Sequence, residues 1–124
     1  MKIDMFFEKQ EGVLKVRAEG MLDAGLVKEM IIKCVEECRK HNVKKVLIDE
    51  TNINIVMSGE QIYGLSDEMK VLGYSGDYDI AIVVSKQTAG LDRVKYLEAR
   101  SRDKNHNVKL FTDGSEAKNW LRAN

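Results

Sequence analysis

The 124-residue sequence lacks proline and net charge and contains only two cysteines. Two cysteines are too few for the disulfide framework of a small secreted domain. Twenty basic residues balance twenty acidic ones, so no overall field favours nucleic acid or an anionic membrane surface. No apolar run reaches transmembrane length, and the first residues lack the apolar core of a signal peptide. We therefore expect one cytoplasmic domain, residues 1–124, with no membrane span and no nucleic-acid partner.

The first 41 residues show two different hydrophobic periods. Apolar and polar residues alternate on both sides of a turn at residues 9–12, which predicts a β-hairpin from Ile3 to Glu19. From Asp23 to about His41 the apolar residues recur at helical spacing instead. This segment is expected to be an amphipathic helix that follows the hairpin.

The next segments alternate between strand and helix patterns. Continuous aliphatic runs at Val43–Ile48 and Ile80–Val84 are typical of inner parallel strands that are covered on both faces. Helical spacing predicts a helix from Ser58 to Leu72 and another from about Thr88 to Lys104. Repeated strand-helix alternation favours a mainly parallel sheet.

The C-terminal segment carries a helix start signal directly after a short apolar run, residues 107–111. Asp113 can accept hydrogen bonds from the first-turn amides while Glu116 reaches back, as in a capping box. Ala117, Trp120 and Leu121 then share one helical face. The predicted order is β-β-α-β-α-β-α-β-α: an α/β fold with one mixed five-stranded sheet, an N-terminal hairpin and four helices.

The C-terminal pattern F-T-D-x-x-E-A-x-x-W-L, residues 111–121, resembles the signature of uncharacterised bacterial proteins with the STAS-like (SpoIIAA-like) fold. The resemblance implies that fold over nearly the whole chain. It also points to a branch without an assigned reaction, sometimes grouped with CRAL-TRIO-like lipid-binding proteins.

A second stretch, residues 46–59, resembles the anti-sigma-factor antagonists, in which a strand ending in Leu-Asp leads to a phosphorylated serine at a helix start. Asp49 and Ser58 fall where the strand-end acid and the phosphoacceptor would fall. The antagonists' Asp-Ser pair is replaced by Met57-Ser58, and their glycine-rich helix opening is reduced to Gly59. Ser58 is therefore a candidate phosphoacceptor, although Ser-x-x-Gln is also a simple helix cap.

We interpret Glu50–Met57 as the longest loop at the carboxyl ends of the strands, the edge at which open α/β sheets bind ligands. Candidate binding residues at this edge are Asp49, Thr51, Asn52, Asn54 and Met57. They combine hydrogen-bonding groups with apolar surface, which suggests a ligand or partner of mixed polarity.

Metal, cofactor and catalytic sites have little support. Cys34, Cys38 and His41 could present three ligands from one helix face, but the two cysteines continue the apolar stripe, and His41 is expected to face solvent. Adjacent Asp49 and Glu50 would point to opposite faces of a strand, which disfavours a magnesium site. We expect no metal, no cofactor and no catalytic residue.

Three functional classes remain open. The first is a non-catalytic regulatory or protein-interaction module, and the second is a module that binds a small apolar ligand or lipid. An enzyme comes last, because the sequence offers no combination of base, nucleophile and oxyanion donor. Self-association as a homodimer is a further expectation. Phe6 and Val13 are apolar on the polar face of the hairpin, and either Ala81 and Val83 or Ile82 and Val84 would face an uncovered side of the sheet.

Overall fold

The computed structural model describes residues 2–69, 71–73, 76–87, 91–92, 95, 98–99 and 107–123. Apart from the helix expected from Thr88 to Lys104, its elements follow the predicted order. They are β1 (Lys2–Glu8), β2 (Val13–Leu22), α1 (Ala24–His41), β3 (Lys45–Ile55), α2 (Gly59–Glu68), β4 (Asp79–Val83), β5 (Asn107–Phe111) and α4 (Gly114–Ala123). Three helices are thus described where four were expected. The expected helix from Thr88 to Lys104 lies largely outside the described residues.

The five strands form one sheet in the order β1-β2-β3-β4-β5. β1 pairs with β2 in the antiparallel sense, as a hairpin requires, and the other three neighbouring pairs are parallel. The predicted single mixed five-stranded sheet is confirmed, with an antiparallel strand at one edge.

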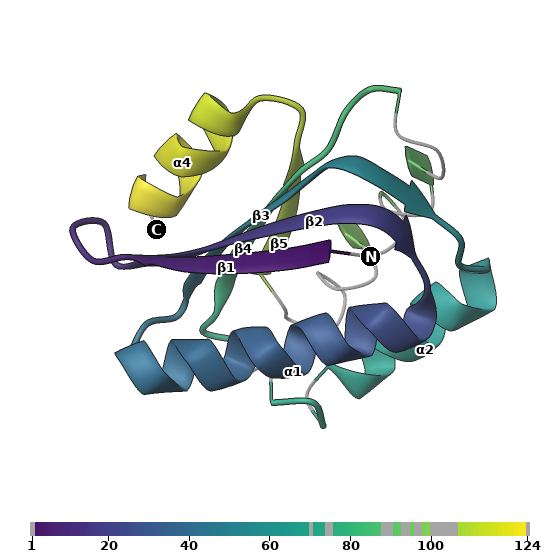
Figure 1. Ribbon diagram of the computed structural model, residues 1–124, viewed down its shortest axis with the longest axis horizontal. Helices are drawn as coiled ribbons and strands as arrows, with labels where there is room; N and C mark the ends of the chain where they lie inside the picture. Colours follow the sequence, from purple (N-terminus) through teal and green to yellow (C-terminus); the bar gives the residue numbers. More distant parts are fainter. Residues whose placement is uncertain are drawn as a thin grey trace.

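Helices cover both faces of this sheet (Figure 1), with α1 and α2 below it and α4 above it in that view. The larger core lies between the sheet and the α1–α2 layer and includes Leu14, Val46, Ile62 and Leu65. A smaller core under α4 joins Val13, Leu47, Ala81, Val83, Ala117 and Leu121.

The position of α4 removes one argument for self-association. Val13 was expected on the polar face of the hairpin, and either Ala81 and Val83 or Ile82 and Val84 on an uncovered face. Val13, Ala81 and Val83 are instead buried beneath α4, and Ile82 and Val84 lie in the main core. Lys45 Nζ also donates to the carbonyl of Leu121 at 2.6 Å, which ties the end of α4 to the start of β3. Of the side chains named for self-association, only Phe6 remains exposed, at 62%.

Local signals account for the helix ends. Asp23 caps α1 through the amide of Leu26 at 2.9 Å, and Asn42 ends it in the left-handed conformation that asparagine tolerates. The expectation that His41 faces solvent was wrong in part. Its ring stacks on Phe7 of β1, with centroids 4.2 Å apart, because the last turn of α1 lies against the hairpin.

Candidate functional site

The segment interpreted as a loop, Glu50–Met57, is mostly strand. β3 continues to Ile55 because β2 is ten residues long and offers a parallel partner as far as Leu22. Ile53 and Ile55 point into the main core while Asn52 and Asn54 are exposed, so the segment has the period of a strand. The loop interpretation was therefore wrong, and only residues 56–58 separate β3 from α2.

A bulge interrupts β3 at the centre of this region. Arg17 pairs with Asp49, but two residues further along β2, Glu19 pairs with Asn52, so β3 holds one extra residue. The bulge changes which side chains face the core. Before it the even-numbered Val46 and Ile48 are in the main core; after it the odd-numbered Ile53 and Ile55 are.

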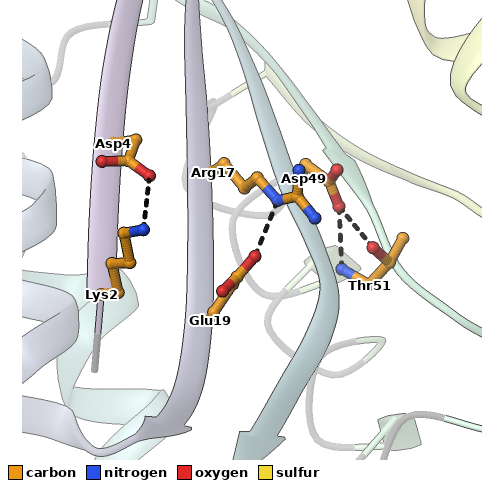
Figure 2. A network of polar contacts seen from close by, with 6 residues as sticks. All are labelled: Lys2, Asp4, Arg17, Glu19, Asp49 and Thr51. Atoms are coloured by element: carbon orange, nitrogen blue, oxygen red, sulfur yellow. Dashed lines mark hydrogen bonds and ion pairs between the residues drawn. The ribbon is translucent and has the colours of Figure 1, made fainter.

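Asp49 fixes the geometry of the bulge. Its Oδ1 accepts from the amide of Thr51 at 3.0 Å and from the Thr51 hydroxyl at 2.7 Å. Figure 2 shows this pair beside the ion pair between Arg17 and Glu19 on the neighbouring strand, 3.0 Å long. The Asp49 side chain thus supplies a hydrogen-bond acceptor for a backbone amide within the bulge.

A buried carboxyl group lies beside the bulge. Glu50 is 4% exposed, and burial, reinforced by the neighbouring Asp49 charge, raises the pKa of Glu50 to about 7. Glu50 continues the side of β3 on which Val46 and Ile48 face the main core, which places the carboxyl on the α1 side of the sheet. Its burial favours the protonated form.

The carboxyl ends of β2 and β3 form a shallow cavity of about 310 Å³ together with the segment after β4. It is lined by Gly20, Met21, Thr51, Asn52, Ile53, Asn54, Ser85 and Gln87. The structure thus brings together three of the predicted binding residues, Thr51, Asn52 and Asn54. We call these eight residues the carboxyl-edge site.

The other predicted residues lie apart from this cavity. Met57 is 3% exposed and belongs to the main core, so its side chain offers no binding surface. Asp49 borders a different depression, on the α4 side of the sheet, together with Phe6, Arg17 and Lys118. Ser58 is exposed at the start of α2 and does not line the cavity.

Ser58 forms the predicted capping box. The amide of Gln61 donates to Ser58 Oγ at 3.2 Å, and the Ser58 amide donates to Gln61 Oε1 at 2.9 Å. The helix-cap interpretation of Ser58 is confirmed, while its role as a phosphoacceptor stays a prediction.

Sequence reasoning missed four members of the carboxyl-edge site: Gly20, Met21, Ser85 and Gln87. Met21 is 60% exposed and pairs in register with Asn54. The Gln87 amide donates to Ser85 Oγ at 3.2 Å, and that hydroxyl donates to Gln87 Oε1 at 2.8 Å. Met21 lies beyond the predicted end of its strand at Glu19, so the parallel register that brings it to Asn54 was not foreseen.

A larger cavity of about 650 Å³ lies at the ends of β4 and β5 beside the first turn of α4. Its wall includes apolar side chains, three lysines and two glutamates: Val84, Leu91, Leu110, Phe111, Lys86, Lys95, Lys109, Glu98 and Glu116. For a ligand-binding module, the sequence placed the pocket between residues 50–57, the helix Ser58–Leu72 and the helix Thr88–Lys104. The last of these segments does contribute Leu91, Lys95 and Glu98 to the larger cavity. The larger cavity also depends on β5 and α4, which that expectation did not include.

The two cysteines are free and buried. Burial is the main cause that raises the pKa of Cys34 to about 12 and that of Cys38 to about 11. Among the described residues, no group of three or more potential metal ligands is present. None of the helices in the described part of the chain is long and apolar enough to span a membrane.

Comparison with solved structures identifies the fold. An uncharacterised DUF3478-family protein with a SpoIIAA-like fold, from Shewanella loihica PV-4, has a TM-score of 0.56 and 21% identity, over 96% of this chain and 93% of that one. The anti-sigma factor antagonist SpoIIAA, in its unphosphorylated form, has a TM-score of 0.52 and 12% identity, over 99% and 100% of the two chains. The chain therefore has the STAS-like, SpoIIAA-like fold, as its C-terminal pattern implied. No family model and no curated protein matches the sequence.

Proposed function

We propose that this protein is a non-catalytic regulatory module that binds another protein through its carboxyl-edge site and the adjacent start of α2. The observation that carries the proposal is the exposure of Met21 and Val56, 60% and 45%, beside the exposed Asn52 and Asn54. Apolar side chains bordered by amide groups are a common composition for a protein-binding surface.

The local backbone supports a binding role for this surface. The Val56 amide donates to the carbonyl of Leu22 at 3.0 Å, which holds the exposed residues of β2 and β3 side by side. A rigid surface loses little conformational entropy when a partner docks. The fold is shared with an anti-sigma factor antagonist, which is consistent with regulation by protein contact.

Ser58 is the proposed regulatory position within this module. Its side chain is exposed at the first turn of α2, where a phosphate would meet the positive end of the helix. Modification there would add negative charge two residues after the exposed Val56 without requiring a new backbone conformation.

Quantitative affinity capture from the source cells tests the proposal. The bait is the native chain, and the site variant carries Asn52→Arg and Asn54→Arg, which place two bulky charges on the surface. Lys33→Glu and Lys40→Glu on the exposed side of α1 give a control variant with two charge changes elsewhere. A partner held by the native and control proteins and lost by the site variant supports the proposal. A partner set that is equal for all three proteins contradicts it.

The alternative function is binding of a small apolar ligand or lipid, and the larger cavity favours it. Its wall contains apolar side chains, and its three lysines outnumber Glu98 and Glu116, which favours an apolar molecule with an anionic group. Native mass spectrometry of the purified protein tests this alternative directly. A co-purified small molecule that Lys109→Glu releases would support it, and the mass of the protein alone would not.

A further inference from the structure

The two edges of the sheet differ in how their outward backbone groups are satisfied. At the β5 edge, the Leu110 amide donates to the carboxylate of Glu98. At the β1 edge, the backbone hydrogen bonds of β1 join it to β2. The Glu8 carbonyl also accepts from the Gly12 amide in the hairpin turn. Within the described residues, nothing else bonds to the outer side of β1. This edge is therefore open to pairing with another strand.

The side chains of β1 favour pairing with another strand and do little to block it. The strand is seven residues long, contains no proline and no bulge in its register with β2, and exposes Phe6. These features leave a regular, extended edge with an apolar side chain near its middle. Its three charged residues, Lys2, Asp4 and Glu8, decide which register such a pairing can take.

We propose that β1 pairs in the antiparallel sense with β1 of a second copy of this chain, centred on Met5, to form a homodimer with a continuous ten-stranded sheet. In this register Lys2 lies opposite Glu8 of the second copy, and Asp4 lies opposite Phe6. The two-fold symmetry repeats each pair, so the interface contains two attractive Lys2–Glu8 pairs. Opposite charges that face one another across strands stabilise a sheet.

Neighbouring registers are disfavoured by charge. Directly opposed residues of antiparallel strands lie on the same face of the sheet. The pairing can therefore shift only by an even number of residues. Centring on Asp4 places Asp4 opposite its own copy, and centring on Phe6 places Asp4 opposite Glu8 twice. Both alternatives therefore contain like charges, which destabilise a cross-strand pair.

The ion pairs within one chain leave Lys2 and Glu8 available to pair across the proposed dimer. Lys2 and Asp4 approach to 3.9 Å, and both side chains are more than 60% exposed. Glu8 and Lys15 are 3.7 Å apart, and their side chains are 28% and 33% exposed. The long and exposed pair of Lys2 and Asp4 contributes little to stability, so Lys2 can turn to Glu8 of the second copy with little loss to the fold.

A charge-swap experiment on the full chain tests the dimer. Sedimentation equilibrium over a concentration series compares the native protein with Lys2→Glu, Glu8→Lys and the double variant. Each single reversal replaces attraction by repulsion at two sites, so we expect the dissociation constant to rise about tenfold. The double variant restores opposite charges and should dimerise like the native protein. Lys33→Glu on α1 is the control for net charge and should have no effect.

Variants with one added cysteine each identify which residues lie opposite one another in the dimer. Directly opposed residues of antiparallel strands have Cα atoms about 4.5–5.5 Å apart, within the range of a disulfide. Met5→Cys should therefore cross-link to its own copy under oxidation, and Asp4→Cys and Phe6→Cys should not. Cys34 and Cys38 are buried and do not compete. A monomeric mass at every concentration, failure of the double variant to restore dimerisation, or cross-linking through Asp4→Cys or Phe6→Cys would overturn the proposal.

Discussion

Asp49 and Thr51 are joined by two hydrogen bonds that share one carboxylate oxygen, at 3.0 Å from the Thr51 amide and 2.7 Å from its hydroxyl. This relationship holds the β3 bulge in place, and the bulge turns Asn52 and Asn54 outward. The exposed surface of the carboxyl-edge site therefore depends on a local contact between residues two positions apart.

Removing the Thr51 hydroxyl should destabilise the protein modestly. Thr51→Val keeps the shape of the side chain and deletes only one of the two bonds, so we expect a loss of about 1 kcal/mol. Asp49→Ala deletes both bonds and leaves the Thr51 amide without this acceptor, for an expected loss of about 2 kcal/mol. Urea unfolding measures both, with the exposed Asn54→Ala as control. Equal stability of all four proteins would show that the bulge does not need Asp49.

Glu50 should make stability depend on pH. Its pKa rises from 4.5 to about 7 on folding, so the folded state favours the protonated form. Stability is therefore highest below about pH 4.5 as far as this group is concerned, falls as the pH rises to 7, and is then lower by roughly 3 kcal/mol. Glu50→Gln removes this penalty. We expect the variant to be more stable than the native protein at pH 8, with the difference small at pH 5.

Urea unfolding at these two pH values checks the expectation. Glu36→Gln, on the exposed side of α1, controls for the change in net charge. A gain from Glu50→Gln that is the same at both pH values would assign the effect to packing instead of ionisation. A loss at pH 8 would show that the Glu50 carboxylate is favourably bound in the folded protein.

The capping box at Ser58 gives a prediction for the start of α2. Ser58→Ala removes the acceptor of the Gln61 amide and should cost about 1 kcal/mol, whereas Ser58→Asp can still cap and should remain near native stability. Thermal unfolding of the two variants provides the comparison. Equal loss for alanine and aspartate would argue that the serine hydroxyl, and not a general acceptor, is required.

The two buried cysteines should be unreactive in the folded state. Burial keeps both thiols protonated at neutral pH, and the thiolate is the reactive form. We expect no reaction with a thiol-specific disulfide reagent until the protein unfolds, and two equivalents after unfolding. Rapid modification of the folded protein would show that α1 opens from the sheet.

Strong periodicity and capping made most of the fold predictable. The hairpin, α1, the buried run of β4 and the cap at Ser58 all follow from short-range patterns. Residues 50–57 were missed because an acidic and polar stretch with one extra residue breaks the two-residue period of a strand. The alternation of Asn52, Ile53, Asn54 and Ile55 was the available signal, and it becomes clear only when β2 is known to continue beside it.

The candidate site was predictable in part for the same reason. Thr51, Asn52 and Asn54 were correctly grouped because they are close in sequence. Met21 and Gln87 reach them only through parallel strand pairing, which no local pattern encodes. Met57 was expected to offer binding surface, but its side chain lies in the main core. An apolar residue next to a helix start can face either solvent or the core, so the sequence alone does not decide between them.

Hydrogen exchange can locate the proposed partner-binding surface at the carboxyl ends of β2 and β3. The native chain is measured alone and in complex with the partner that affinity capture identifies. We expect slower amide exchange on binding at residues 20–22 and 51–58 and little change in α1. Slowed exchange confined to β4, β5 and the start of α4, with residues 51–58 unchanged, would contradict it.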